Sequence, residues 1–468
     1  MRNAHVRFMC CPSVVEVGKK TTVFVRPRDI SREFLEDQEY ELGIVGVFDD
    51  HPDYHTRLPL DHDFTVKDGC LVFEHTFEKE QEYSIRFCRK GQKEERIPLY
   101  AVEADLFARR PLKGDLHTHS YYSDGADGVA MTPADYREEG FDFFFLTDHN
   151  RMYTSEYAAK LYEGIPLGME ILRGEEVHTP GSLLHIVHAG GRESVCDRYI
   201  SDPAGYEREL DALEESLLHI DPQYRRRYAM AKWACDRIHE AGGIAILAHP
   251  YWRPNANNLA NEFIDLLYDE KLFDAFEVLG GINTVHNNMQ LALWHQKCLE
   301  GKRLSVVASS DSHDHDSEKG IFARRFTLVF AKENTNEAIL QGIREGFSVA
   351  GEIPAGDSKE VRFYGDLRLV NFAHFLFQNY FNETWRLCVG EGILMRRYAE
   401  GEDVGQMLAA LAPTVEDFYK RFYGLAEQQG LPACRRAYLQ QLRQIQQTKG
   451  PITKGSQLYI YGGNERRE

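Results

Sequence analysis

Hydrophobic and polar positions alternate in short runs along the first hundred residues of the chain. The β-rich runs are residues 21–25, 42–48, 70–77, 82–88 and 97–102. Turn-forming pairs such as Asp-Asp, Pro-Asp and Asp-Gly separate them, and short strands with regular turns are typical of an antiparallel sandwich. Residues 1–110 are therefore predicted to form an Ig-like β-sandwich domain for packing or recognition, because no catalytic cluster stands out in it.

The pattern changes near Arg109, after which strongly apolar runs alternate with polar, helical stretches. The apolar runs are residues 141–147, 171–174, 183–189, 243–248, 275–279, 304–309 and 326–330. Strands of this kind are buried on both faces, and their alternation with helices is typical of a parallel sheet or barrel. Residues 111–351 are predicted to form this α/β barrel. A charged insertion at 194–241, with helices expected at 207–218 and 225–239, is predicted to lie over one rim.

The last part of the chain is rich in aromatic residues and has helical signals. Residues 367–398 contain many Phe, Tyr, Leu and Trp, and Pro413 begins a segment with a pattern close to a capping box. Such aromatics are more often core or interface residues than cofactor contacts. Residues 352–468 are therefore predicted to be mainly helical, with no chemistry assigned.

Charge and composition narrow the class of protein. The 468 residues carry a formal net charge of -18, which disfavours binding of duplex nucleic acid through a broad basic surface. The nine cysteines have no regular spacing and are expected to be reduced, mostly buried thiols. No apolar run has membrane-spanning length and the start lacks a secretory pattern, so no membrane partner and a cytoplasmic location are expected. The oligomeric state is left open.

Side chains that can bind metal ions follow short apolar segments at four places. They are His117, His119 and Asp124 after a short apolar approach near residue 112, Asp148 and His149 after the run 141–147, His249 after 243–248, and Asp311 and His313 after 304–309. Residues two apart on a strand share a face, so His117 and His119 can bind one metal together. Parallel strands of a barrel end on one face, where active sites lie. The sequence therefore predicts a metal centre at that face.

Two neighbouring segments offer further ligands but leave a choice open. Glu175 and Glu176 are adjacent, and a carboxylate at a strand end can bridge two cations through its two oxygens. Adjacent residues of a strand point to opposite faces, so only one of the two glutamates is expected in the site. By the same alternation, His185 and His188 cannot both face it.

The motifs occur together in one order, which is similar to that of the polymerase and histidinol phosphatase (PHP) superfamily. The motifs are Asp115-x-His117-x-His119, Ser123-Asp124-Gly125, Thr147-Asp148-His149, Gly174-x-Glu176, His185, Ala248-His249-Pro250 and Ser310-Asp311-x-His313. The resemblance covers roughly residues 112–350, about half of the chain. It implies a distorted (βα)7 barrel with a two- or three-metal centre that hydrolyses phosphoesters as a phosphatase or a nuclease.

The resemblance also implies which residues bind each ion. It assigns His117, His119, Glu176 and Asp311 to one metal, Glu176, His185 and His249 to a second, and Asp124, His149 and His313 to a third. Many members have histidine in place of Asp124, so the third position can differ in metal preference. Asp115 and Asp148 would orient the ligands. Mixed nitrogen and oxygen ligands admit two or three divalent ions of Zn, Mn or Fe.

These residues predict hydrolysis of a phosphate ester by a metal-activated hydroxide. Arg253 and Arg151 follow the ligand motifs and are candidates for gripping phosphate with paired donors. The expected substrate is a small phosphorylated metabolite or a short nucleotide. One alternative is an exonuclease acting on single-stranded ends, with Tyr251 and Trp252 stacking on bases. Another alternative is a metal-bound sensor or scaffold without turnover.

Overall fold

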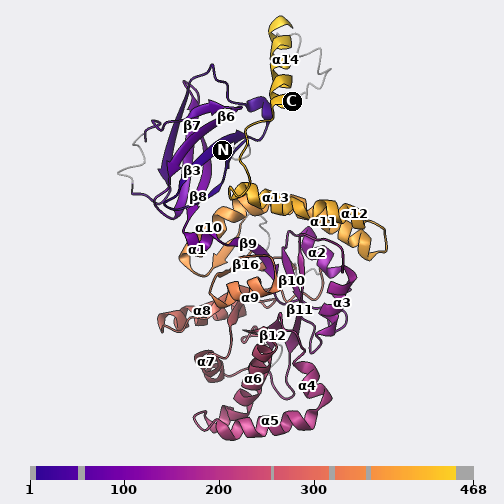
Figure 1. Cartoon of the computed structure of the whole chain (residues 1–468). Coiled ribbons are helices and arrows are strands. Elements are labelled where there is room, and N and C mark those ends of the chain that lie inside the picture. The colour runs from indigo at the N-terminus through magenta and orange to yellow at the C-terminus, as the bar shows by residue number, and fades with distance from the viewer. Residues whose placement is uncertain (1–6, 51–57, 254–257, 316–321, 355–359, 450–468) are drawn as a thin grey trace, which may run out of the picture. The chain divides into compact units, whose positions relative to one another are not determined.

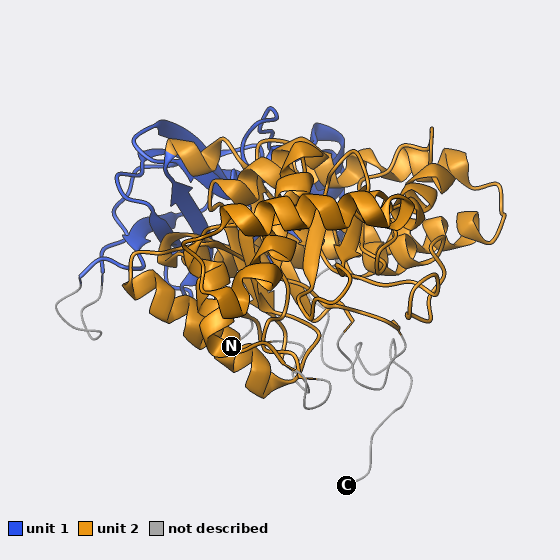
Figure 2. Cartoon of the chain, turned by 90° about the horizontal axis from the view of Figure 1, so that it is seen from below, with its two compact units in different colours: residues 1–103, 420–468 blue, residues 104–419 orange. Residues whose placement is uncertain are grey.

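The computed structural model describes residues 7–50, 58–253, 258–315, 322–354 and 360–449. The chain folds into two compact units (Figure 2), one of residues 1–103 with 420–468 and the other of residues 104–419. Residues 352–419 belong to the second of these units and residues 420–468 to the first. The division falls within helix α13 (Pro413–Phe422).

The first unit contains a sandwich of two four-stranded sheets with the orders β1-β3-β6-β5 and β2-β8-β7-β4. Its elements are β1 (Phe8–Cys11), β2 (Val14–Glu16), β3 (Lys20–Pro27), η2 (Ile30–Arg32), β4 (Tyr40–Gly46), β5 (Thr65–Lys67), β6 (Cys70–Thr76), β7 (Gln81–Arg89), β8 (Glu95–Val102) and α14 (Ala433–Lys449). Val23, Leu71 and Ile85 belong to one buried core formed by both sheets. Neighbouring strands are antiparallel except β2 and β8, which are parallel.

The second unit is built around a ten-stranded sheet that curves into a nearly closed barrel (Figure 1), with the order β15-β14-β13-β12-β11-β10-β9-β16-β17-β18. The strands are β9 (Arg110–Asp115), β10 (Phe143–Leu146), β11 (Glu170–Val177), β12 (Ile186–Ala189), β13 (Ile244–Leu247), β14 (Ala275–Leu279), β15 (Ser305–Ala308), β16 (Arg325–Ala331), β17 (Ser348–Glu352) and β18 (Arg362–Tyr364). Every residue of β10, β12, β13 and β14 is buried. The α/β class and the burial predicted from the apolar runs are confirmed.

Contacts between β15 and the strands at the other side of the sheet close the barrel. At the carboxyl end, Thr118 after β9 pairs in parallel with Ser312 after β15. Lower in the barrel, Thr327 Oγ1 of β16 accepts a hydrogen bond from Ala308 N at 3.0 Å and donates one to Ala308 O at 2.8 Å. The ends of β9 and β15 are therefore held beside each other.

Strand β12 runs antiparallel to both of its neighbours, β11 and β13. The parallel direction expected for every strand of the barrel was wrong here, and β16 and β17 are antiparallel as well. The reason is the short connection between β11 and β12, since a parallel pair needs a crossover of a dozen or more residues. The beginning of β12 therefore lies with the carboxyl ends of its neighbours.

Helices surround the barrel and extend the unit. They are α1 (Ala104–Phe107), α2 (Thr132–Glu138), α3 (Tyr153–Leu161), α4 (Cys196–Ser201), α5 (Pro203–Ser216), α6 (Pro222–Glu240), α7 (Asn261–Asp269), α8 (Thr284–Leu299), α9 (Asn336–Arg344), α10 (Leu367–Leu376), the π-helical turn η3 (Phe377–Phe381), α11 (Asn382–Ala399), α12 (Gly405–Leu411) and α13. The insertion predicted at 194–241 forms α4, α5 and α6. Leu210 of α5 and Tyr228 of α6 share a buried core with Leu247 of β13.

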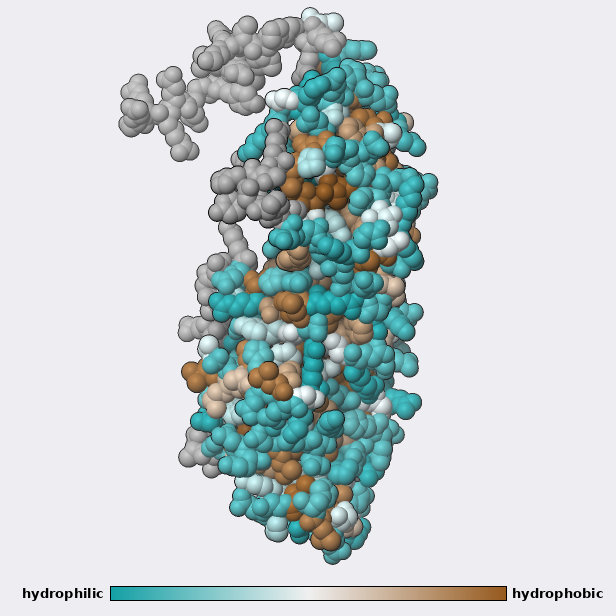
Figure 3. Space-filling view, turned by 90° about the vertical axis from the view of Figure 1, so that its left-hand side faces the viewer, coloured by the Kyte–Doolittle hydropathy of each residue, from teal (hydrophilic) through white to brown (hydrophobic). Residues whose placement is uncertain are grey.

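On the face drawn in Figure 3, hydrophilic residues predominate and hydrophobic ones form small, separate groups. In the part of the chain that the structure describes, no helix has both the length and the apolar character needed to cross a membrane.

Candidate metal centre

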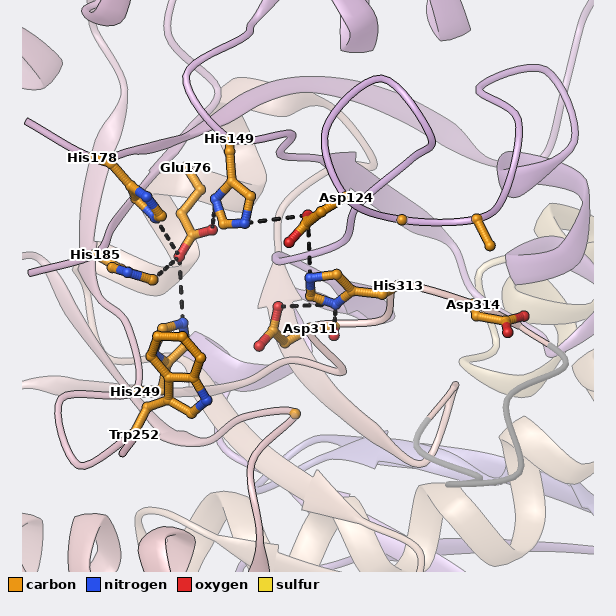
Figure 4. A pocket seen from close by; sticks show the side chains of 13 residues that line it. Asp124, His149, Glu176, His178, His185, His249, Trp252, Asp311, His313 and Asp314 are labelled. Atoms are coloured by element: carbon orange, nitrogen blue, oxygen red, sulfur yellow. Dashed lines mark hydrogen bonds and ion pairs between the residues drawn. The ribbon is translucent and has the colours of Figure 1, made fainter. Parts of the chain in front are cut away.

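A cavity of about 660 Å³ lies where the barrel strands place their predicted ligands (Figure 4). Its described lining consists of Asp124, Gly125, Ala126, His149, Glu176, His178, His185, His249, Trp252, Gly281, Asp311, His313 and Asp314. His117 and His119 are buried beneath it. The described lining contains imidazoles and carboxylates but neither Lys nor Arg, which is a composition suited to binding cations rather than anions.

Glu176 lies at the centre of the cluster, with imidazoles around both of its oxygens (Figure 4). Its Oε2 lies 3.3 Å from His117 Nε2, 3.4 Å from His119 Nε2 and 2.7 Å from His149 Nδ1. Its Oε1 lies 2.8 Å from His185 Nδ1 and 3.3 Å from His249 Nε2. This arrangement allows one carboxylate to bridge two cations.

Asp124 and Asp311 supply the other carboxylates of the cluster. Asp124 Oδ1 lies 3.3 Å from both His149 Nε2 and His313 Nε2. Asp311 Oδ1 lies 3.1 Å from His119 Nε2. The structure therefore brings together all nine residues predicted as ligands, which are His117, His119, Asp124, His149, Glu176, His185, His249, Asp311 and His313.

Several donor atoms of the cluster are buried and lie at ion-pair distances from one another, but they form no hydrogen bond of good geometry. They include His117 Nε2, both ring nitrogens of His119, His149 Nδ1, His185 Nδ1 and both oxygens of Glu176. An unsatisfied buried polar group costs about 1–3 kcal/mol. A cluster of such atoms therefore needs a bound group, such as a metal ion, that satisfies them together. Within each candidate group the ligand atoms lie within 4.8 Å of one another. The residues fit divalent ions.

Backbone conformation agrees with this interpretation, while the titrating groups divide: burial lowers the pKa values of His117, His149, His249 and His313, but neighbouring carboxylates outweigh it and raise them. His249 and Asp311 adopt φ values of 22° and 48°, which residues other than glycine rarely adopt. Burial raises the pKa of Glu176, but His117 and His185 outweigh it and hold the value well below its usual range. Burial lowers the pKa of His185 to about 4. At neutral pH both side chains are thus in the deprotonated forms that bind metal.

The choice between neighbouring ligands follows from strand alternation. Glu176 and His185 face the cavity, whereas Glu175 and His188 lie opposite each other in the β11–β12 pair. Glu175 Oε1 accepts hydrogen bonds from His188 Nδ1 at 3.1 Å and from Val195 N at 2.6 Å. Glu175 and His188 are therefore a buried pair outside the metal cluster, in which the carboxylate is satisfied and His188 Nε2 has no hydrogen-bond partner.

Asp115 joins the ends of two strands and does not touch a metal-facing atom. Its carboxylate accepts hydrogen bonds from His117 N at 3.2 Å, from Ser310 N at 3.1 Å and from the Tyr136 hydroxyl at 3.1 Å. Burial raises its pKa to about 7. Asp115 thus acts on the ligands through the backbone that carries them.

Asp148 has a similar place beneath the loop that carries Asp124. It accepts hydrogen bonds from Ser120 N at 2.7 Å and from Ser123 Oγ at 2.7 Å. These bonds fix a loop in which Asp124 itself is half-exposed. The orienting role expected for Asp148 is therefore directed at the loop rather than at an imidazole ring.

The structure does not bring the predicted arginines to the cluster. Arg253 and Arg151 are exposed and neither lines the cavity. Trp252 does line it, with 42% of its surface exposed and its ring centroid 5.3 Å from that of His185. Among the described lining residues, bound cations would therefore be the main groups to balance a phosphate.

Two residues of the site were missed by sequence reasoning. Glu277 of β14 is fully buried, and its Oε2 lies 3.0 Å from His117 Nδ1; a carboxylate inside an apolar run was the available signal. His178 lines the cavity and lies two positions after Glu176, a spacing that places both on one face of an extended segment.

No family model matches the chain, and no curated protein matches it. A two-domain protein from Bacteroides vulgatus containing a predicted PHP-like metal-dependent phosphoesterase is similar over 52% of this chain and 65% of its own, with 24% identity and a TM-score of 0.35. The chain thus matches less than two thirds of that protein's length.

Two further structures are similar over shorter parts of the chain. A candidate metal-dependent phosphoesterase from Bifidobacterium adolescentis matches 44% of this chain and 88% of its own, with 18% identity and a TM-score of 0.32. An amidohydrolase from Chromobacterium violaceum matches 43% of this chain and 88% of its own, with 22% identity and a TM-score of 0.30.

Proposed function

We propose that the chain is a hydrolase that uses divalent metal ions to cleave phosphate esters. The observation that carries the proposal is Glu176, whose buried carboxylate presents each oxygen to a separate group of imidazoles. Two-metal sites of this kind serve in-line displacement at phosphorus, because they stabilise both the attacking and the leaving oxygen.

Each part of the cluster contributes a separate task. Divalent ions, when bound, lower the pKa of a coordinated water and neutralise phosphoryl oxygens. Glu277 accepts the Nδ1 proton of His117 at 3.0 Å, which leaves Nε2 free to bind metal. Asp115 and Asp148 hold the backbone that carries the ligands. The protein thereby fixes the donor atoms before substrate arrives.

The cavity favours a small substrate. Its volume of about 660 Å³ lies in the range of sites for small molecules. We propose a phosphorylated metabolite or a short nucleotide, hydrolysed as a monoester or a diester, with Zn, Mn or Fe as the metal. The exposed ring of Trp252 at the cavity supports a second candidate, a single-strand exonuclease, since an aromatic ring can stack on a base.

The decisive experiment combines elemental analysis of the purified protein with hydrolysis of an aryl phosphate and of its diester, with and without added manganese or zinc. Two or more ions per chain and metal-dependent turnover are expected, and the monoester-to-diester preference distinguishes phosphatase from nuclease. His117→Ala together with His119→Ala is expected to abolish both metal retention and turnover. Absence of metal and of hydrolysis in the wild type would leave a sensor or scaffold.

A matched control removes an imidazole elsewhere. His219 is 60% exposed and lies outside the cavity lining, so His219→Ala is expected to keep the wild-type metal content and rate. Unchanged metal content and hydrolysis in the double alanine variant would contradict the proposal.

A further inference from the structure

We infer that His178 is a ligand of the metal position on the Oε1 side of Glu176, together with His185 and His249. This inference rests on the proposed function, because it assumes that the cluster binds divalent ions. It adds to the ligand set a residue that the sequence motifs did not include.

The ring of His178 converges on the same carboxylate oxygen as the two predicted ligands (Figure 4). Its Nε2 lies 3.4 Å from Glu176 Oε1, beside the nitrogens of His185 at 2.8 Å and His249 at 3.3 Å. The ring centroid of His178 is 3.6 Å from that of His185 and 4.4 Å from that of His149. His178 also forms a candidate group with His149 and Glu176, but the oxygen nearest to its Nε2 is the one that faces His185 and His249. One proton can join only one of these three nitrogens to the oxygen. A metal ion can bind all three nitrogens at once, provided that each of them is unprotonated.

A second observation concerns the hydrogen bonding of His178 Nε2. His178 Nε2 is buried and has no hydrogen-bond partner, although the side chain as a whole is 27% exposed. A histidine that served only as a polar surface group would turn this nitrogen towards water, since an unsatisfied buried polar atom costs about 1–3 kcal/mol. A metal ion at this position would satisfy it.

The backbone of His178 is held from two sides. His178 N donates a hydrogen bond to Asn150 Oδ1 at 2.8 Å, and the Tyr199 hydroxyl donates to His178 O at 3.0 Å. Tyr199 lies in α4 of the insertion, and Asn150 follows directly on the predicted ligand His149. The insertion thereby helps to fix a residue of the metal cluster, which is the support that metal ligands commonly have.

A fourth protein donor changes the expected behaviour of this position. Four protein ligands hold an ion more firmly than three, and a zinc site can expand to five ligands to take water or substrate. Three imidazoles and one carboxylate also form a nitrogen-rich set, which suits zinc or iron better than manganese. We therefore expect the ion on the Oε1 side to be the last one lost when a chelator is added.

The test is metal binding by His178→Ala, with His219→Ala as the matched loss of an exposed imidazole. Metal content after dialysis against a chelator, zinc affinity by calorimetry, and the visible spectrum of the cobalt-substituted protein are measured. His178→Ala is expected to lose one ion per chain, to bind zinc at that position at least roughly tenfold more weakly, and to change the cobalt spectrum. His219→Ala is expected to match the wild type.

The alternative outcomes separate this inference from the function it rests on. Wild-type metal content, zinc affinity and cobalt spectrum in His178→Ala, with slower hydrolysis, would assign His178 to substrate contact and overturn the inference alone. A wild type that binds no ion would overturn the proposed function itself. If the alanine variant fails to fold, His178→Gln, which keeps a polar side chain of similar length, carries the same expectations.

Discussion

The two faces of the β11–β12 pair contain the same residue types in opposite states. On one face His188, Ser194 and Val195 all donate hydrogen bonds to the Glu175 carboxylate, and the one atom of the pair without a partner is His188 Nε2. On the other face Glu176 lies among imidazoles with both oxygens lacking a hydrogen-bond partner. The comparison shows that a metal site is distinguished by convergent donors without partners, and not by the presence of Glu and His.

The strongest way to break this comparison is to remove one carboxylate charge from each face. Glu176→Gln is expected to abolish metal retention and to lower the rate of hydrolysis by at least roughly 100- to 1000-fold, the loss that follows removal of one charge-stabilising group. Elemental analysis and steady-state kinetics measure both effects. Glu175→Gln is expected to keep the metals and the rate.

In a measurement of stability, Glu175→Gln is expected to have the larger effect and Glu176→Gln the smaller one. Glu175 accepts three hydrogen bonds, and an amide places an NH₂ group against donors, so Glu175→Gln is expected to lower the free energy of unfolding by about 1–3 kcal/mol. Denaturant titration of the metal-free proteins checks this. Loss of metal by Glu175→Gln, in a folded protein, would show that the two faces are not independent.

A smaller effect on metal binding is expected from Glu277, which contacts the ligand His117 rather than the metal itself. Glu277→Gln removes the carboxylate that fixes the proton on His117 Nδ1, and loss of such a partner lowers metal affinity by roughly tenfold to a hundredfold. The ion beside His117 is expected to weaken in calorimetry. Unchanged affinity would mean that the buried carboxylate serves packing alone.

The smallest effect is expected at the outer edge of the cluster. Asp124 is 55% exposed, so Asp124→Ala is expected to weaken only the ion beside His149 and His313, by roughly tenfold. Asp124→His restores a ligand there and is expected to recover the affinity for zinc. A variant that loses every ion would contradict separate positions and indicate that Asp124 organises the whole centre.

The sequence predicted much of this site because its signals are local. A polar residue after a buried strand, as at His149 or His249, is placed by its own strand. The alternation of residues along a strand showed only that one of Glu175 and Glu176 faces the site, and the resemblance to the PHP superfamily favoured Glu176. The same alternation predicted neither His178 nor Glu277, because a single histidine or glutamate at such a position is more often structural.

The direction of a strand and the position of a long side chain could not be predicted, because neither depends on local sequence alone. The apolar run before β13 indicated a strand at β12 but not that it is antiparallel, and this direction places His185 at the mouth of the barrel. Arg253 follows His249 in the chain yet does not line the cavity. Proximity in sequence does not determine where a long side chain in a loop lies.

The sequence by itself determined the buried strands, the ligand types and their order, because hydrophobic burial and residue alternation act over a few positions. Only the tertiary structure decided which donors remain without partners. Barrel closure between Thr118 and Ser312 brings residues from opposite ends of the unit to one carboxylate, and the short turn before β12 adds a third imidazole there. Both depend on contacts between distant segments, which no local pattern specifies.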